Sequence, residues 1–327
     1  MHIAGPSDLK AQRELPFSSY LEVVRHSPSR CRTAVARALF PYLFRRIGRS
    51  AVESCEFDSL KNYETSYRRL ARLLGRDEDC LPAGEIEFLL SVENRGGHAG
   101  TIALHEYLFL SAFASILAPE RAVEIGTLAG FSAAIIAAAL HRRHPHQKGV
   151  LVETVDKNTH SVVDTDKPVG FQIPDIIPNF ADAVRVRAPA DSAVIRELSR
   201  CDELQLIFID ADHQHPRPLL DLLRAAPCIR SGGWILVHDI KLGTIGRTSA
   251  EIDHTLRAAA SFGAEWLFAY WPFRKIAGGN IGALQIPARK AAIVPTALRL
   301  MKLPFEMKGS SHSRVRRELY ESLLPLV

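Results

Sequence analysis

The sequence contains little cysteine and no long hydrophobic run. Its five cysteines are widely spaced, and no two of them form a C-x-x-C pair. This spacing argues against a disulfide framework or a zinc–thiolate site and fits a reducing compartment. The N-terminus lacks the apolar core of a signal peptide, and the longest apolar stretches, Tyr107 to Pro119 and Phe131 to Leu140, are shorter than the roughly 18–20 residues that cross a bilayer. The sequence therefore predicts a soluble, cytoplasmic protein without a transmembrane segment.

Neither sign of charge dominates, but the two signs are unevenly distributed. The 327 residues include 41 Lys and Arg and 36 Asp and Glu. Residues 1–55 hold 9 basic and 4 acidic side chains and residues 286–327 hold 8 and 3, which leaves 24 and 29 between them. The basic ends predict docking, assembly into a homo-oligomer or contact with an anionic surface. Nucleic acid is not an expected partner, because the sequence shows no platform of interleaved aromatic and basic residues.

The middle of the chain alternates short strand-like runs with helical patterns. The strand-like runs are AVEIG (122–126), VLVETVD (150–156), AVRVRA (183–188), LQLIFID (204–210) and WILVHD (234–239). Buried apolar strands separated by helices are typical of a parallel α/β sheet with right-handed crossovers. Two later runs, EWLFAYW (265–271) and IGALQIP (281–287), are close enough to pair as an antiparallel ribbon at one edge.

This alternation divides the sequence into three parts. We predict an N-terminal helical extension or lid over 1–100, a main α/β domain over 101–287 and a basic C-terminal tail over 288–327. Within the first part, helices are expected over 58–75 and 84–94, and an apolar helix begins the main domain at 101–117. The loops expected to contact a substrate lie at 56–100, 157–180 and 240–250.

The first strand of the main domain ends in a glycine-containing turn. Glu124 lies at the strand end, Gly126 opens the turn, and Gly130 and Ser132 begin the next helix. Glycine lets the backbone approach a ligand, and the N–H groups of a helix start attract an anionic group. The pattern is E-x-G-x-x-x-G and differs from the G-x-G-x-x-G of dinucleotide enzymes. Taken alone, such a turn is more often structural than ligand-binding.

Carboxylates follow the next two strands. Asp156 could accept both hydroxyls of a ribose or could be a solvated turn residue. Asp191 and Ser192 could contact an adenine edge, or Asp191 could cap the helix that it precedes. Their order on successive strand ends favours a nucleotide site, because open α/β sheets bind ligands beyond the carboxyl ends of their strands.

In these features the sequence resembles the class I S-adenosylmethionine-dependent methyltransferases over about residues 95–287. The segment VEIGTLAGFSA looks like their first motif, especially in the O-methyltransferases related to catechol O-methyltransferase and to the macrolide-sugar enzymes. The resemblance implies a Rossmann-like, mostly parallel sheet with an antiparallel edge strand, and S-adenosylmethionine as cofactor. It also implies a methionine end at Glu124, Gly126, Thr127, Gly130 and Ser132, a ribose contact at Asp156 and an adenine contact at Asp191 and Ser192.

The last two parallel strands deliver aspartates and histidines to one rim. LQLIFID leads into Asp210, Asp212, His213 and His215, and the following strand ends in His238-Asp239. Asp210, His238 and Asp239 are predicted to supply N and O ligands to one divalent cation, because charged groups at the ends of apolar strands need a partner. His215, which precedes Pro216, is expected to be structural.

The resemblance also implies roles for the residues at the ends of these two strands. In the catechol-type enzymes, metal ligands follow the fourth and fifth strands, and Asp210, His238 and Asp239 fall on those positions. Histidine stands where those enzymes have an acid, which leaves open Mn²⁺, a two-carboxylate Mg²⁺ site or no metal. His213 occupies the offset of their general base, a lysine, and imidazole is a workable base near neutral pH. Asp212 is a candidate to orient it.

The sequence therefore predicts an S-adenosylmethionine-dependent O-methyltransferase acting on the hydroxyl of a small molecule such as a sugar, a phenol or another secondary metabolite. An NAD-dependent dehydrogenase is disfavoured, because the dinucleotide motif is missing and the Asp/His rim would be unexplained. A methyltransferase-fold binding or scaffold protein without catalysis is the alternative from another class. A catalyst needs Asp210 and Asp239, whereas a scaffold tolerates their loss and depends on the Arg and Lys of its ends.

Overall fold

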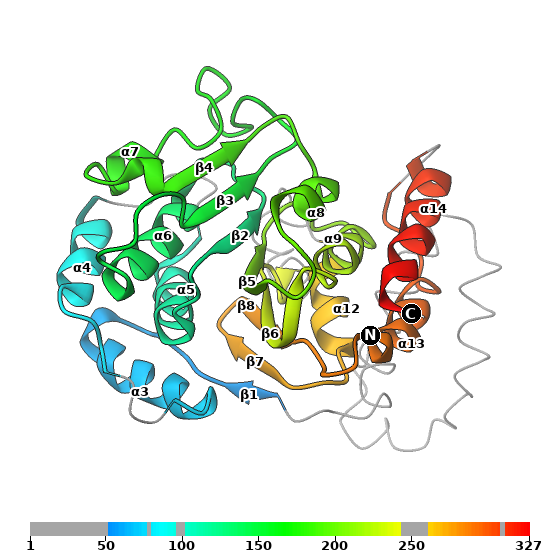
Figure 1. Ribbon diagram of the computed structural model, residues 1–327, viewed down its shortest axis with the longest axis horizontal. Helices are drawn as coiled ribbons and strands as arrows, with labels where there is room; N and C mark the ends of the chain where they lie inside the picture. Colours follow the sequence, from blue (N-terminus) through cyan, green and yellow to red (C-terminus); the bar gives the residue numbers. More distant parts are fainter. Residues whose placement is uncertain (1–51, 77–79, 96–101, 243–260, 308–310) are drawn as a thin grey trace, which may run out of the picture. The chain divides into compact units, whose positions relative to one another are not determined.

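A computed structural model describes residues 52–76, 80–95, 102–242, 261–307 and 311–327. The strands are β1 (Glu53–Ser54), β2 (Ala122–Ile125), β3 (Val152–Val155), β4 (Val184–Arg187), β5 (Leu204–Ile209), β6 (Ile229–Val237), β7 (Lys275–Gly278) and β8 (Ile281–Gln285). They form one eight-stranded sheet in the order β1-β7-β8-β6-β5-β2-β3-β4 (Figure 1). The strand order reverses between β2 and β5, so a ligand site is expected at the carboxyl ends of these strands.

The pairing within the sheet confirms a mostly parallel α/β fold. β4, β3, β2, β5 and β6 run parallel, and β8 runs antiparallel to both β6 and β7. The antiparallel strand therefore lies inside the sheet, and the edge beyond it is β1, which pairs in parallel with β7.

One predicted strand is wrong. The run 265–271 belongs to helix α12 (Gly263–Tyr270), and the partner of β8 is β7. Trp266, Leu267, Phe268 and Tyr270 are all buried in this helix. A short run that is apolar on every side fits a buried helix as well as a buried strand, so periodicity cannot separate the two.

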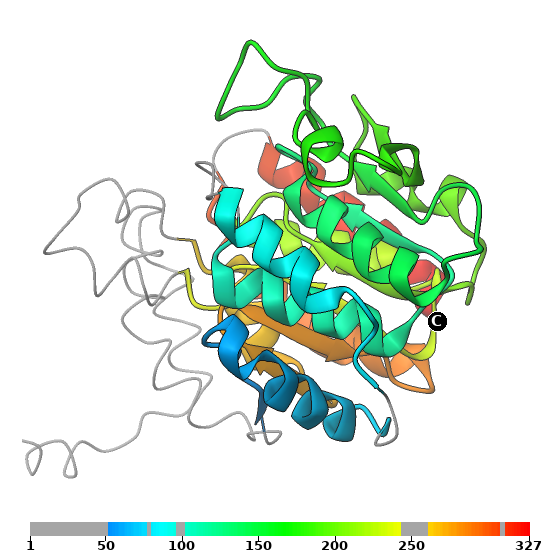
Figure 2. The ribbon, with the colours of Figure 1, turned by 90° about the vertical axis from the view of Figure 1, so that its left-hand side faces the viewer.

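One face of the sheet is covered by helices from the first half of the chain (Figure 2). They are α3 (Tyr63–Leu73), α4 (Glu85–Arg95), α5 (Leu104–Leu117) and α6 (Phe131–Arg143), with α3 preceded by the 3₁₀ turn η2 (Leu60–Asn62). The helices predicted over 58–75, 84–94 and 101–117 are confirmed, although α5 begins at Leu104. Residues 131–140 of α6 are all buried, which explains why this helix has no polar face.

A buried carboxylate joins these helices. Glu85 on α4 accepts hydrogen bonds from the Tyr63 hydroxyl at 2.8 Å, the Ser111 hydroxyl at 2.6 Å and Arg142 Nε at 2.6 Å. A buried charge is tolerated only when it is paired and hydrogen-bonded in this way. The N-terminal helices are thus fixed to α5 and α6 through specific contacts as well as apolar packing.

The other face carries helices from the second half of the chain. They are α8 (Ile195–Leu198), α9 (Arg217–Ala225), α12, α13 (Val294–Leu300) and α14 (Ser311–Leu323). The shorter elements of the chain are η3 (Ala181–Ala183), η4 (Ser192–Val194), η6 (Lys290–Ile293), η7 (Leu324–Leu326) and α7 (Ile173–Ile176), which lies beside α6. In the part of the chain that the structure describes, no helix is long and apolar enough to cross a membrane.

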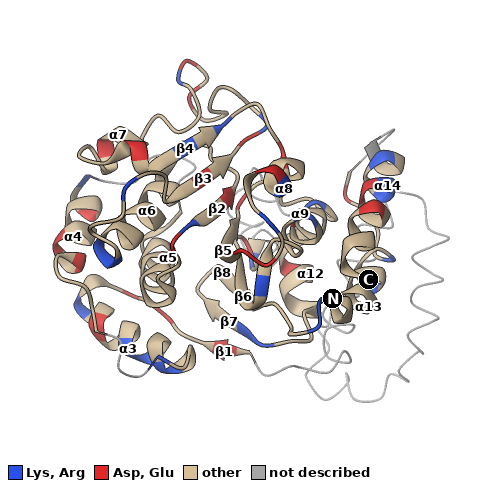
Figure 3. Ribbon diagram, viewed as in Figure 1, with Lys and Arg blue, Asp and Glu red and all other residues tan. Residues whose placement is uncertain are grey.

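The basic C-terminal region docks on this second face. Val315 and Leu319 of α14 are buried, and Arg224 Nη2 of α9 lies 3.2 Å from Glu318 Oε2. Helix α14 also carries Arg314, Arg316 and Arg317, and Arg314 Nε lies 2.7 Å from Glu318 Oε1. Figure 3 shows basic positions in blue along α14. The C-terminal residues are therefore part of the folded domain.

Candidate active site

The turn between β2 and α6 is built on two glycines. Gly126 has φ +103°, and a Cβ there would clash with the backbone carbonyl of Asp210 at the end of β5. Gly130 has φ +85° and is the N-cap of α6. A Cβ at Gly130 would clash with Ile173, in the segment that follows β3. Only glycine allows this close approach, so the turn is held tightly against two neighbouring segments.

Asp156 braces the same turn from the end of β3. Its Oδ2 accepts the backbone N–H groups of Thr127 at 3.1 Å and Leu128 at 3.0 Å, and its Oδ1 accepts the N–H of Asn158 at 2.8 Å. The carboxylate is half-buried and lies where the sequence places the ribose contact. A carboxylate can accept about four hydrogen bonds, so this bracing leaves room for a ligand hydroxyl.

Glu124 lies buried in β2, under the turn. The Thr154 hydroxyl donates to Glu124 Oε2 at 2.5 Å and shares a 2.7 Å hydrogen bond with the Thr127 hydroxyl. Burial raises the pKa of Glu124 to about 8, although the hydroxyls of Ser132 and Thr154 work against this. Thr127 and Ser132 are themselves buried, so the residues predicted for the methionine end share one neighbourhood.

The two residues predicted to flank an adenine have partners within the protein. Asp191 Oδ1 accepts the backbone N–H of Ala193 at 2.9 Å, which is the helix cap that the sequence offered as an alternative. The Ser192 hydroxyl donates to Asp221 Oδ1 at 2.5 Å and accepts from Arg224 Nη1 at 3.0 Å. Ser192 thus anchors the segment after β4 to α9, and for both residues an adenine contact stays a prediction.

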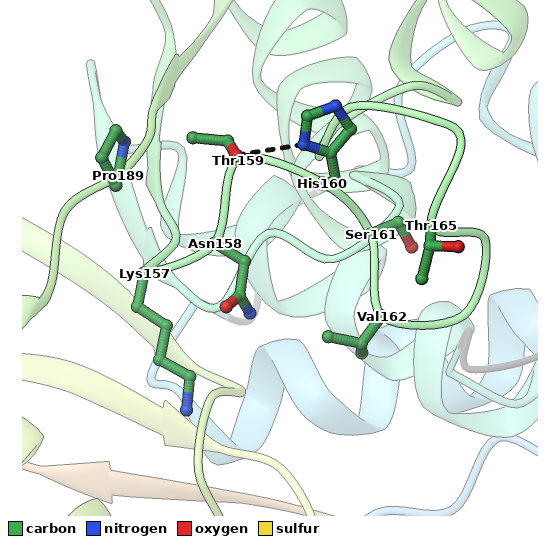
Figure 4. Close-up of a pocket in the computed structure, with 8 residues that line it drawn as sticks. All are labelled: Lys157, Asn158, Thr159, His160, Ser161, Val162, Thr165 and Pro189. Carbon is green, nitrogen blue, oxygen red and sulfur yellow. Dashed lines mark hydrogen bonds between the residues drawn. The ribbon is translucent and has the colours of Figure 1, made fainter.

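An open pocket of about 420 Å³ lies beside these strand ends (Figure 4). It is lined by Lys157, Asn158, Thr159, His160, Ser161, Val162, Thr165 and Pro189. Most of these residues come from the segment directly after Asp156, within the loop that we expect to contact a substrate, and Pro189 follows β4. The pocket thus opens at the nucleotide end of the sheet.

At the other end of the rim, two residues predicted from the sequence form a dyad. His213 Nε2, after β5, lies 3.1 Å from Asp239 Oδ2, after β6. The second oxygen of Asp239 accepts from Asn280 Nδ2 at 2.7 Å. The side chain of His213 is 31% exposed and that of Asp239 is 12% exposed. An imidazole oriented by a fixed carboxylate and open to solvent on one side is suited to accept a proton.

Asp212, which the sequence suggested to orient His213, contacts other residues. Its Oδ1 accepts the backbone N–H of Gln214 at 3.0 Å, and its Oδ2 lies 3.8 Å from Arg217 Nε. His215 is buried and bonds the carbonyl of Leu300 through Nε2 at 3.1 Å, which confirms its structural role.

His238 lies between two carboxylates. Its Nδ1 is 2.9 Å from Asp210 Oδ1, and its Nε2 is 3.4 Å from Glu106 Oε2 on α5. Burial opposes the charged imidazole, yet Asp210 and Glu106 together raise the pKa of His238 well above its ordinary value. Burial raises the pKa of the Asp210 and Glu106 carboxyl groups, but the nearby His238 lowers it more. The pKa of each carboxyl therefore lies below its ordinary value. The three side chains therefore form an ion-paired cluster.

The divalent cation that the sequence led us to consider stays a prediction. His238 Nδ1 is hydrogen-bonded to Asp210, whereas its buried Nε2, 3.4 Å from Glu106 Oε2, has no hydrogen-bond partner among the described residues. Among the residues that the structure describes, no group of three or more His, Cys, Asp or Glu side chains is arranged to hold a metal ion. Asp210, His238 and Asp239 are brought together, as neighbours in a hydrogen-bonded network.

Sequence reasoning missed two members of this network. Glu106 is a buried acid on the apolar helix α5, and Asn280 follows the Gly278-Gly279 pair between β7 and β8. A charged residue on an otherwise apolar helix must find a partner, and this signal could have identified Glu106. The sequence carries no comparable signal for Asn280, whose role depends on the antiparallel placement of β8 beside β6.

A scan against protein families matches residues 123–240 to a methyltransferase domain. This segment includes all but the first residue of β2, the whole of β3, β4, β5 and β6, and helices α6 and α9. Over these residues the chain is similar to that domain family. The matched segment of this domain includes every site residue predicted above, and the sheet order around it confirms the predicted Rossmann-like class I architecture.

Solved structures similar to this chain include two O-methyltransferases and a further methyltransferase. An O-methyltransferase from Bacillus cereus in complex with SAH is 20% identical, and the match covers 69% of this chain and 100% of that chain with a TM-score of 0.39. The O-methyltransferase TomG from Streptomyces achromogenes in complex with SAM is 15% identical, and the match covers 70% of this chain and 99% of that chain with a TM-score of 0.39. The SAH-bound methyltransferase PaMTH1 from Podospora anserina is 14% identical, and the match covers 67% of this chain and 94% of that chain with a TM-score of 0.41. No curated protein matches the chain.

Proposed function

We propose that this protein transfers a methyl group from S-adenosylmethionine to the hydroxyl of a small molecule, with His213 as the general base. The methyltransferase domain supports the choice of donor, as do the glycine turn, the buried Glu124 and the brace of Asp156, which fit the methionine and ribose ends of that cofactor. Solved O-methyltransferases from Bacillus cereus and Streptomyces achromogenes contain SAH and SAM respectively.

The observation that carries the proposal is the His213–Asp239 dyad at 3.1 Å. Gly126, in the predicted donor turn, lies against the backbone of Asp210, which is three residues before His213. Donor turn and base therefore meet at neighbouring strand ends, where a donor and an acceptor could be aligned. A binding protein without catalysis has no need of an oriented and partly exposed imidazole at this place.

When bound, S-adenosylmethionine supplies an electrophilic methyl group on a sulfonium sulfur. The chain's task is to align the acceptor with that carbon and to remove the acceptor's proton. Asp239 holds Nε2 of His213, so Nδ1 is the nitrogen that takes the proton from the acceptor hydroxyl. The resulting imidazolium is stabilised by the Asp239 carboxylate.

Calorimetry with S-adenosylmethionine, followed by a screen of phenol, sugar and polyketide acceptors, tests the proposal. We expect His213→Asn to bind the donor as the wild type does and to lose about 10²–10⁴-fold in kcat. His146→Asn, at an exposed histidine after α6, is the matched control and should keep full turnover. Absence of donor binding at millimolar concentration would reject the proposal.

Donor binding without turnover of any acceptor would favour the alternative, a methyltransferase-fold binding protein. In that case Asp239→Ala should leave its interactions unchanged, whereas loss of basic residues from the ends should weaken them. Self-association and contact with an anionic surface are further proposals for those ends, and sedimentation at two salt concentrations would test both, because charge-based contacts weaken with salt.

A further inference from the structure

Asn280, in the turn between β7 and β8, forms three hydrogen bonds with the segment that follows β6. Its Nδ2 donates to Asp239 Oδ1 at 2.7 Å, its Oδ1 accepts the Lys241 N–H at 2.9 Å, and its carbonyl accepts the Ile240 N–H at 3.1 Å. We propose that Asn280 is a positioning residue of the active site, which turns the Asp239 carboxylate toward His213. The inference rests on the proposed function for its effect on catalysis, whereas the geometry that it predicts can be tested without a donor or an acceptor.

The orientation of the Asn280 amide follows from its partners. A backbone N–H can only donate, so the oxygen of the amide faces Lys241 and its nitrogen faces Asp239. Asn280 is only 9% exposed, so water competes little for either bond. One side chain therefore fixes both the carboxylate of Asp239 and the backbone two residues further on.

The backbone of Asp239 needs such support. Its φ of +62° lies in the left-handed region, which residues other than glycine seldom adopt, although aspartate tolerates it better than most. A backbone of this kind persists where the surrounding structure holds it, and here hydrogen bonds with Asn280 involve Asp239 and the next two residues. Because the backbone sets the direction in which the Asp239 side chain leaves the chain, Asn280 acts on this direction as well as on the carboxylate itself.

The turn that carries Asn280 is itself held against α5. A Cβ at Gly278 would collide with the ring of Phe109, and a Cβ at Gly279, which has φ +68°, would collide with His105. Within the sheet, β8 pairs with β6, the strand that leads into the braced segment. Asn280 is thus fixed by both α5 and the sheet, so its amide is a rigid support.

This support decides which oxygen of Asp239 faces the base. With Oδ1 held by Asn280, Oδ2 is left to contact His213 Nε2, at 3.1 Å. Without the amide, the carboxylate can rotate about its last bond, and the imidazole loses a fixed partner. A misplacement of about 1 Å at an active site can cost about 100-fold in rate. Asn280 therefore acts on the reaction through Asp239, and its loss should leave donor binding at the β2–α6 turn as it is.

Kinetics of single and double variants of the full chain test the inference. We expect Asn280→Ala to lower kcat about 10- to 100-fold, while the acceptor KM and the donor Kd change less than about threefold. In an Asp239→Gly background no carboxylate remains to be positioned, and glycine accepts the left-handed backbone, so the same change should alter kcat less than about twofold. Gln285→Ala is the matched control and should keep full kcat, because its amide donates to the Gly232 carbonyl at the far end of β8. An equal loss of kcat from Asn280→Ala in both backgrounds, or no loss in either, would overturn the inference.

The crystal structure of Asn280→Ala is a second test, which needs neither donor nor turnover. We expect Asp239 Oδ2 to move beyond hydrogen-bond distance of His213 Nε2, to more than about 3.5 Å, and to keep its contact in Gln285→Ala. An unchanged contact of 3.1 Å in Asn280→Ala would overturn the inference. Asn280→Asp, which keeps an acceptor for the Lys241 N–H and loses the donor to Asp239, replaces Asn280→Ala in both tests where that variant fails to fold. Absence of donor binding by the wild type would count against the proposed function alone.

Discussion

Glu306, in the C-terminal region, forms two hydrogen bonds with the backbone of His215. Its Oε2 accepts the His215 N–H at 2.8 Å, and its own N–H donates to the His215 carbonyl at 2.9 Å. The same carboxylate accepts the N–H of Phe262 at 3.1 Å. The loop that carries His213 is therefore held in place by the C-terminal region.

These hydrogen bonds predict that Glu306→Ala destabilises the fold and lowers turnover. The variant leaves buried backbone donors without their acceptor, and we expect a loss of about 2–3 kcal/mol in the free energy of unfolding, measured in urea. kcat should fall while the Kd of the donor changes little, because the donor turn lies elsewhere. Glu318→Ala, on α14 and paired with Arg224 and Arg314, is the control and should leave kcat unchanged. Equal kcat values for the two variants would show that Glu306 does not position the loop that carries His213.

Asp239→Asn is expected to lower kcat by about 10²-fold or more, because the amide cannot stabilise an imidazolium on His213. Asparagine tolerates the left-handed backbone of this residue, φ +62°, so the fold should survive. Asp212→Asn is the matched control on the same loop as His213 and should change kcat less than threefold. Steady-state kinetics with one acceptor would decide, and a larger effect at Asp212 would contradict the geometry.

Gly126→Ala is expected to abolish donor binding and to destabilise the fold, because the new Cβ would collide with the backbone of Asp210. Gly149 offers a control with a similar backbone, φ +95°, and open space around its Cβ position. Gly149→Ala should cost only the backbone strain of about 1–2 kcal/mol. Urea unfolding and donor calorimetry on both variants separate the two effects. Normal donor binding by Gly126→Ala would show that the turn can move.

Glu124→Gln is expected to change how stability depends on pH. The folded pKa of Glu124 is about 8, against an ordinary 4.5, so between these values the native state holds a proton that the unfolded state has lost. This contribution is present below pH 4.5 and is lost as pH rises through 8, by at most about 1.4 kcal/mol per pH unit. Unfolding in urea at pH 5–8 should show the wild type losing stability relative to Glu124→Gln. Glu120→Gln, at an exposed carboxylate, should parallel the wild type.

The sheet was predictable because its strands are short apolar runs bounded by polar or glycine residues. The run 265–271 was not, since an all-apolar segment of that length is ambiguous until its neighbours are known. At the site, the strand-end residues Asp210, His213, His238 and Asp239 followed from strand order. The charge of Glu106 on the apolar helix α5 indicated that it needs a partner. Only the folded sheet shows that α5 and the β7–β8 turn bring Glu106 and Asn280 to the rim.

The edge strand of the sheet, β1, comes from well before the family-matched segment and pairs with β7. The Cys55 N–H continues this pairing with a hydrogen bond to the Ala277 carbonyl. Helix α14, which packs against α9 on one face of the sheet, comes from well after the family-matched segment. A genetic crossover at either boundary of the match would part β1 from β7, or α14 from α9. In recombination between relatives, residues 53–327 would therefore have to be inherited together, and new acceptor preferences would arise by point changes in the rim loops and not by exchange of modules.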